Sequence, residues 1–196
     1  SIRFPAASCG VVGLKPTWGR VSRYGILALA ESMDHVGPIT RNSADASVVL
    51  QAIAWHDPLD PTSLSNPVPD MLSGIKKDIK AIRIGYDRAY ASDDVDPELA
   101  SAVMTGVEVL KDLGAEIVEV RMPNIDGYLP AWPVLCSAEA VAAHREYYPH
   151  RRDDYGPWFR EWLDKGSEIT GADYAEANNI RAECNGRIRE AFDDID

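Results

Sequence analysis

Residues 81–121 read AIRIGYDRAYASDDVDPELASAVMTGVEVLKDLGAEIVEVR, and this stretch decides the fold class. Its two ends, 81–85 and 116–120, are short runs rich in Ile and Val, which is typical of β-strands. Between them, Asp96 and the proline after it form a helix start, and Gly114 is suited to end that helix. The order strand, helix, strand predicts a βαβ unit in a layered α/β fold.

The predicted helices have apolar side chains spaced three and four residues apart, as an amphipathic helix requires. The helix that ends before Gly114 is expected to bury a stripe of four side chains, Leu99, Val103, Val107 and Leu110. Two further helices are predicted at 44–54 and 132–146. A last helix follows residue 170, and its apolar stripe consists of Ala177, Ile180, Cys184, Ile188 and Ala191.

Two other segments lack a helical pattern. Residues 1–41 are rich in glycine and proline, which indicates short strands and tight turns with backbone conformations that glycine tolerates. The prolines of residues 56–69 predict an extended surface segment.

The composition bounds the class of protein. The 196 residues are 45% hydrophobic and 26% charged, which excludes a disordered or collagen-like chain. The formal net charge of −11 argues against binding to nucleic acid or an anionic membrane, because both need a basic face. The sequence contains no run of 18 apolar residues. The three cysteines, Cys9, Cys136 and Cys184, are too far apart for a metal knuckle and odd in number, so we expect a reducing, cytoplasmic compartment.

The residues alone show no complete catalytic set. The Walker A, G-x-G-x-x-G and G-x-S-x-G motifs are all absent from the sequence. Glu139 is unusual because it lies on an apolar helix face. We favour a partly buried acid with a local partner over a catalytic role for Glu139.

The opening segment Ser1-Ile2-Arg3-Phe4-Pro5-Ala6 resembles the last part of the amidase signature, in which a Gly-Gly-Ser turn precedes an apolar residue, Arg, any residue, Pro and a small residue. The resemblance continues through three longer segments and a short one, 9–17, 19–25, 33–41 and 56–58. A match over nearly 60 residues is specific, and residues 60–196 resemble the amidase signature family more loosely.

The resemblance implies a fold and a mechanism. The family fold is an α/β/α sandwich around a large mixed β-sheet, which is expected to be incomplete in this chain. Catalysis in the family uses a Ser–cis-Ser–Lys triad, and Ser1 matches its nucleophile. The bridging serine and the lysine lie upstream in such proteins, so Lys15 is not the catalytic lysine. We therefore expect residues 1–196 to be the central part of a single amidase domain, without its N-terminal and C-terminal parts.

The resemblance also suggests roles around the substrate. Trp132 falls near a position where the family contributes an aromatic residue to the substrate pocket, although a core position is an equal alternative. Arg3 either binds an acidic substrate group or bonds loop carbonyls, and Asp34 and Arg41 are expected to support loops. No metal or organic cofactor is implied. The expected partner is a small-molecule amide substrate, and homo-oligomerisation stays open.

Three alternatives to a simple amide hydrolase stay open. One is the glutamine-hydrolysing component of a tRNA-dependent amidotransferase, which releases ammonia from glutamine; residues 124–160 depart from the pattern expected for that component. In the second, Ser1 is an N-terminal nucleophile whose own α-amine, with a pKa of about 8, is the base. The third is a catalytically inert fragment or scaffold.

Overall fold

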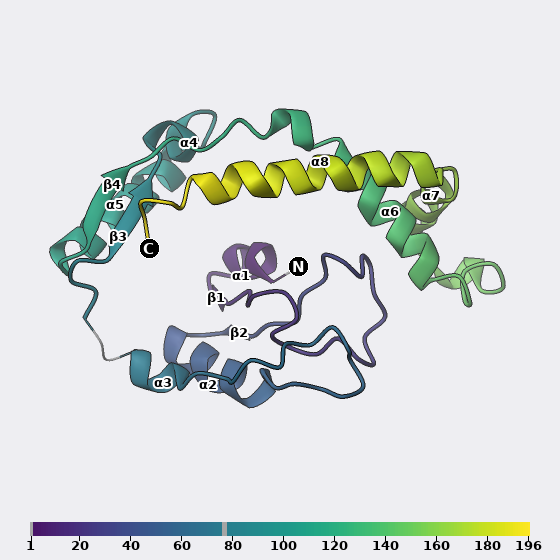
Figure 1. Ribbon diagram of the computed structural model, residues 1–196, viewed down its shortest axis with the longest axis horizontal. Coiled ribbons are helices and arrows are strands. Elements are labelled where there is room, and N and C mark those ends of the chain that lie inside the picture. The colour runs from purple at the N-terminus through teal and green to yellow at the C-terminus, as the bar shows by residue number, and fades with distance from the viewer. Residues whose placement is uncertain (1, 76–77) are drawn as a thin grey trace. The chain divides into compact units, whose positions relative to one another are not determined.

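A computed structural model describes residues 2–75 and 78–196. The chain divides into two compact units. The first unit comprises Ser1–Lys77 and Val134–Thr170, and the second comprises Asp78–Pro133 and Gly171–Asp196. Both units combine helices with a two-stranded sheet, which confirms the α/β class (Figure 1).

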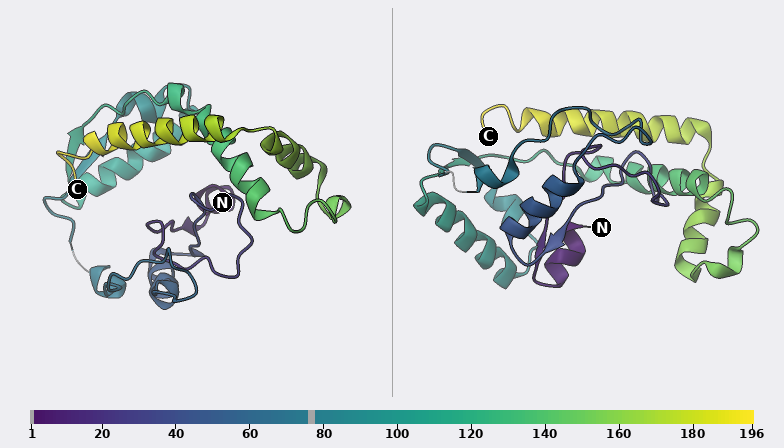
Figure 2. Two further views of the ribbon diagram at one scale, coloured as in Figure 1. Left: turned by 45° about the vertical axis from the view of Figure 1, so that its right-hand side comes forward. Right: turned by 90° about the horizontal axis from the view of Figure 1, so that it is seen from below.

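The N-terminal part of the first unit is built on a small antiparallel sheet. Strand β1 (Val12–Gly13) pairs with β2 (Ile39–Thr40), and Val12 lies opposite Thr40. Helix α1 (Arg3–Ser8) contacts β1, and helix α2 (Ser43–Ile53) contacts both strands (Figure 2). The core of this region consists of Val21, Leu50 and Ala54, with Leu14, Val36, Val68 and Met71 packed against it.

The short strands and turns predicted for residues 1–41 are confirmed, but helix α1 was missed. Gly10, Gly19 and Gly25 have positive φ angles of 64°, 79° and 79°, as the glycine pattern predicted. Pro5 lies in the first turn of α1. A proline is tolerated there because the N–H groups of a first helical turn have no partner inside the helix.

Helix α2 confirms the prediction for residues 44–54. The Asn42 side chain caps it by accepting a hydrogen bond of 2.8 Å from the backbone N–H of Asp45. Helix α3 (Met71–Gly74) packs beside α2, and the Met71 N–H donates to Oε1 of Gln51 at 3.2 Å.

The C-terminal part of the first unit is helical. Helix α6 (Ala131–Ala143) confirms the prediction for 132–146, although it ends three residues earlier, and its first turn falls in the second unit. The 3₁₀ turn η2 (Arg152–Asp154) and helix α7 (Pro157–Ser167) follow. Between α6 and α7, the buried ring of His144 makes edge-to-face contacts with Tyr155 and Phe159.

The second unit contains the predicted βαβ arrangement. Strands β3 (Arg83–Tyr86) and β4 (Glu116–Glu119) pair in parallel, with Arg83 opposite Glu116. Helix α5 (Pro97–Asp112) joins them, capped by the Asp96 side chain, and Gly114 beyond its end has a φ of 99°. Between β3 and α5 lies the short helix α4 (Arg88–Ser92), which was not predicted.

The remaining elements of the second unit are the 3₁₀ turn η1 (Asp126–Tyr128) and helix α8 (Gly171–Glu190). The Tyr128 hydroxyl donates to Oε1 of Glu183 at 3.1 Å and links the two elements. The predicted stripe of α8 is its less exposed face, with Ala177 buried and Ile180, Cys184 and Ile188 half-buried.

The predicted stripe of α5 is partly wrong. Leu99 is 57% exposed and Val103 is 40% exposed, whereas Val107 and Leu110 are half-buried. The side chain that takes a place on the covered face is Met104, which is half-buried. A two-stranded sheet is too narrow to cover the whole apolar side of a helix of 16 residues.

Candidate active site

The predicted nucleophile, Ser1, lies outside the described residues. The structure describes the chain from Ile2, which is buried and precedes the first turn of α1. The Ile2 carbonyl accepts a hydrogen bond of 3.2 Å from the Ala6 N–H, so the backbone after Ser1 is held by the helix.

Two glycines allow neighbouring backbone segments to approach Ile2. A Cβ atom on Gly13 would lie 2.7 Å from the Cβ of Ala6 and 2.8 Å from the Ile2 carbonyl oxygen. A Cβ atom on Gly37 would lie 2.9 Å from Cδ1 of Ile2 and would overlap the carbonyl oxygen of Leu14. Contacts this short are incompatible with a side chain at either position. The segment that follows Ser1 is therefore enclosed by two backbones.

Lys15 and His35 form a hydrogen-bonded pair on this side of the first unit. Nδ1 of His35 lies 2.7 Å from the Met33 carbonyl, which can only accept, so Nδ1 is the protonated nitrogen. Nε2 of His35 then accepts from the Lys15 ammonium at 3.1 Å, and Lys15 also donates to the Pro16 carbonyl at 3.0 Å.

The electrostatics of this pair follow from its surroundings. Burial and the positive charge of Arg3 lower the pKa of Lys15. Burial lowers the pKa of His35 as well, and the charges of Lys15 and Arg23 act in the same direction. A neutral His35 that accepts from a charged Lys15 is consistent with both directions.

The other predicted substrate residues lie on helix ends. Arg3 is exposed and begins α1 in the first unit. Trp132 lies in the first turn of α6 and is 56% exposed, so it is not a core residue of the described structure. The substrate-binding roles of both residues stay predictions.

Loop support by Asp34 is confirmed. Oδ2 of Asp34 accepts hydrogen bonds from the backbone N–H groups of Leu29 and Ala30 at 2.8 and 3.1 Å. Arg41 is almost fully exposed and lies 3.8 Å from the Asp45 carboxylate. An ion pair as exposed as this one contributes little to stability.

A buried arginine, which the sequence did not single out, organises the loops beside this region. The Arg23 guanidinium donates to the Glu31 carbonyl and to the Thr62 hydroxyl, and stacks over Trp18 at 4.6 Å. The Arg23 backbone N–H donates to Oδ2 of Asp60 at 2.8 Å. This bond and those from Thr62 lower the pKa of Asp60 to about 2. The proline-rich segment 56–69 is thus extended, as predicted, but fixed by buried polar contacts.

The interpretation of Glu139 as a buried acid with a hydrogen-bond partner is confirmed, but the partner is not local. Glu139 is 9% exposed. Its two carboxylate oxygens accept from the backbone N–H and the hydroxyl of Ser32, at 2.8 and 2.6 Å, across 107 residues of sequence.

The cysteines offer no alternative nucleophile of the usual kind. All three are free: Cys9 is exposed, Cys136 is buried and Cys184 is half-buried. Burial raises the pKa of the Cys136 thiol to about 11, and a thiol in this state is a weak nucleophile.

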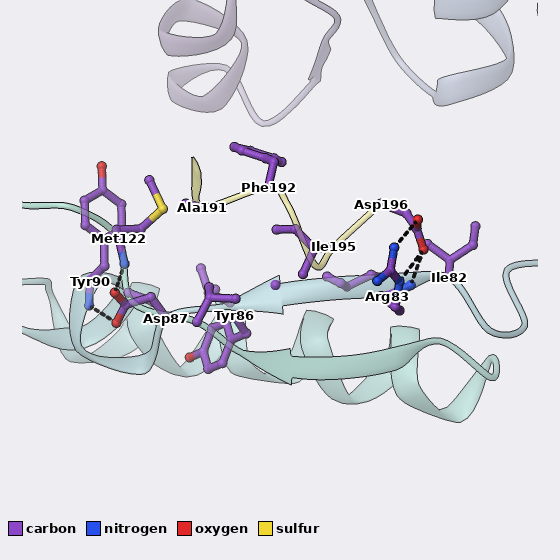
Figure 3. Close-up of a pocket in the computed structure, with 15 residues that line it drawn as sticks. Ile82, Arg83, Tyr86, Asp87, Tyr90, Met122, Ala191, Phe192, Ile195 and Asp196 are labelled. Carbon is purple, nitrogen blue, oxygen red and sulfur yellow. Dashed lines mark hydrogen bonds and ion pairs between the residues drawn. The ribbon is translucent and has the colours of Figure 1, made fainter. Parts of the chain in front are cut away.

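A separate apolar pocket of about 420 Å³ lies in the second unit, between β3 and the C-terminal segment (Figure 3). Its polar members bond to each other: Nη2 of Arg83 lies 2.9 Å from Oδ1 of Asp196, and Asp87 accepts from the Tyr90 and Met122 N–H groups. Neither Arg3 nor Trp132 lines this pocket. It is therefore not part of the predicted site.

Within residues 2–75 and 78–196, no group of three or more His, Cys, Asp and Glu side chains is arranged to hold a metal ion. None of the helices in this part of the chain is long and apolar enough to cross a membrane.

Comparison with known proteins decides the family. The family model named Amidase matches residues 1–196, the whole chain. The chain belongs to the amidase family. A curated relative, an amidase from Pseudomonas putida, is 39% identical over 197 residues, which are 100% of this chain and 42% of the relative. The GatA-type component of the glutamyl-tRNA(Gln) amidotransferase of Gloeobacter violaceus is 48% identical over 147 residues, which are 75% of this chain and 30% of that protein.

A solved structure gives the same result for the fold of the amidase-family chain. The crystal structure of the corresponding glutamyl-tRNA(Gln) amidotransferase component from Thermotoga maritima superposes with a TM-score of 0.82 at 28% identity. The match covers 100% of this chain and 43% of that chain. The predicted family and its α/β fold are therefore confirmed, and the chain spans less than half the length of these relatives.

Proposed function

We propose that residues 1–196 are the central part of an enzyme that hydrolyses a carboxylic amide C–N bond, with Ser1 as its nucleophile. The observation that carries the proposal is the match of the Amidase family model to the whole chain, which begins in the signature segment Ser1–Ala6. The relative from Pseudomonas putida, which is named an amidase, supports the same activity.

The mechanism that we propose is the one implied by the family resemblance. A serine hydroxyl is a poor nucleophile until a base removes its proton. A lysine kept neutral by burial, in a segment upstream of these residues, accepts that proton through a bridging serine. The Ser1 oxygen then attacks the amide carbonyl, and backbone N–H groups of the turn that ends at Ser1 stabilise the oxyanion. The amine leaves with a proton, and water hydrolyses the resulting ester.

The described residues contribute rigidity to this mechanism. Ile2 is buried, its carbonyl is bonded to α1, and the backbones of Gly13 and Gly37 pack against it. A nucleophile joined directly to so constrained a residue loses little entropy when it reaches the attack geometry. The proposed role of Arg3 and Trp132 is to contact the substrate rather than to transfer protons.

Release of ammonia or amine from a panel of simple amides tests the activity. The sample is the complete polypeptide that contains these residues, and the Ser1→Ala variant is the comparison. We expect hydrolysis by the parent protein and a loss of at least about a thousandfold in kcat for the variant. Full activity in Ser1→Ala would exclude Ser1 as the nucleophile.

A second candidate is the glutamine-hydrolysing component of a tRNA-dependent amidotransferase, with glutamine as the amide. The observation that favours it is the 48% identity to the Gloeobacter violaceus amidotransferase component over 147 residues. The two candidates differ in their need for partners. A stand-alone amidase hydrolyses its amide when purified alone, whereas an amidotransferase component is expected to need its partner proteins.

A further inference from the structure

The contact between Glu139 and Ser32 joins helix α6 to a turn far away in the sequence. The carboxylate is buried, and each of its oxygens accepts one hydrogen bond from Ser32, at 2.6 Å from the hydroxyl and 2.8 Å from the backbone N–H. Hydrogen bonds to an ionised carboxylate are about twice as strong as those between neutral groups. A two-point contact of this kind fixes the orientation of Ser32 as well as its position.

Ser32 belongs to a turn that is rigid in itself. The N–H groups of Met33 and Asp34 donate to the Ala30 carbonyl at 2.9 and 2.8 Å, and the Asp34 side chain bonds back to the N–H groups of Leu29 and Ala30. The 29–34 turn therefore moves as one piece, and Glu139 holds that piece on α6.

The segment after this turn leads directly to the residue beside Ser1. His35 accepts from Lys15, and the carbonyl of Pro38 accepts from the Leu14 N–H at 3.1 Å. Between these two bonds, the Gly37 backbone lies against the Ile2 side chain. Residues 29–38 thus form a continuous strip from Glu139 to Ile2.

We propose that Glu139 is a positioning residue of the active site: by holding Ser32 through two hydrogen bonds, it fixes residues 29–38 against Ile2 and so sets the place of Ser1. The proposal rests on the proposed function, because it assigns the consequence to Ser1. Glu139 touches neither the substrate nor the reacting atoms in this account.

Two substitutions at Glu139 separate positioning from other roles in the complete polypeptide. Glu139→Gln keeps an oxygen that can accept from the Ser32 N–H and gains an NH₂ group that can donate to the Ser32 hydroxyl oxygen. Glu139→Ala removes both contacts. We expect a fall in kcat of about tenfold to a hundredfold for Glu139→Ala, with KM little changed, and a fall within about threefold for Glu139→Gln. The pH profile of kcat should be the same in Glu139→Gln as in the parent protein.

Asp87→Ala is the matched control in the second unit. The Asp87 carboxylate also accepts two hydrogen bonds, from the N–H groups of Tyr90 and Met122 at 3.1 and 2.6 Å. Its loss should lower stability without changing kcat. Equal losses of kcat in Asp87→Ala and Glu139→Ala would show that only general destabilisation is measured and would overturn the proposal.

Hydrogen exchange tests the positioning step without any need for catalysis. In Glu139→Ala, amide exchange should become faster in peptides that cover residues 2–14 and 29–38, and Glu139→Gln should restore the slow exchange. If Glu139→Ala does not fold, Ser32→Ala, which removes only the hydroxyl donor, is expected to give a smaller change in the same peptides. Unchanged exchange in both regions would overturn the proposal. An inactive parent protein would instead contradict the proposed function, and the exchange result would still decide the role of Glu139.

Discussion

Gly13 lies so close to Ile2 that a Cβ atom on the glycine would be 2.8 Å from the Ile2 carbonyl oxygen. The same Cβ atom would be 2.7 Å from the Cβ of Ala6 in helix α1. The residue next to the proposed nucleophile is therefore packed against a position where even a methyl group does not fit. This contact ties the glycine pattern of the N-terminal segment to the proposed site.

Gly13→Ala is expected to lower the free energy of unfolding by about 1–3 kcal/mol and to reduce kcat, because the added methyl group must displace Ile2 or α1. Gly106→Ala in helix α5 is the matched control, since a Cβ atom there meets nothing within 4 Å. It should raise stability by about 0.5–1 kcal/mol through the better helix propensity of alanine. Urea unfolding with amide hydrolysis measures both effects, and equal stability of the two variants would contradict the packing argument.

Arg23→Met should destabilise the protein strongly. The buried guanidinium bonds the Glu31 carbonyl and the Thr62 hydroxyl, so its removal leaves buried polar groups without their donor. We expect a loss of about 3–5 kcal/mol in the free energy of unfolding. Arg41→Met, at an arginine whose side chain is 90% exposed, should change it by less than about 0.5 kcal/mol. A small effect at Arg23 would show that its contacts are dispensable.

His144 predicts a loss of stability on mild acidification. The ring is buried beside Phe159, Nδ1 lies 2.9 Å from the Tyr155 hydroxyl oxygen, and burial lowers the pKa of His144 below its ordinary 6.5. The unfolded chain therefore binds a proton more readily than the folded chain. Stability is complete above pH 6.5 and falls as the pH drops from about 6.5 towards the lower pKa of the folded state.

His35 has a pKa shifted in the same direction and contributes to the same slope. Unfolding midpoints in urea, measured between about pH 5 and pH 8, check the prediction for His144→Gln, whose stability should depend less on pH than that of the parent protein. The same substitution at the exposed His150 is the control and should leave the dependence in place. A parent protein equally stable at both ends of that range would contradict the argument.

Local signals explain which parts of the fold could be predicted. The helix between Asp96 and Gly114 was found because its cap, its first proline and its terminal glycine are all encoded within the segment. Exposure of Leu99 was not foreseen, because the face that a helix buries is decided by the elements packed against it. Helix α1 was missed because Pro5, which usually breaks helices, is harmless in a first turn.

The candidate site was predicted unevenly for the same reason. The signature segment placed Ser1 and Arg3 from sequence alone, since it is contiguous. The contacts of Arg23 with Asp60 and of Ser32 with Glu139 span 37 and 107 residues, and no local pattern specifies such pairs. Only the apolar surroundings of Glu139 in the sequence gave a signal, and they did not name its partner.

Labelling of the complete polypeptide with a serine-reactive phosphonate probe, located by peptide mass spectrometry, tests the central claim most directly. A base-activated serine reacts with such probes, whereas ordinary serines do not. We predict one label on Ser1, lost in Ser1→Ala and also lost in the isolated 196-residue chain, which lacks the proposed base. A label on another residue, with Ser1 unmodified in an active enzyme, would contradict the account.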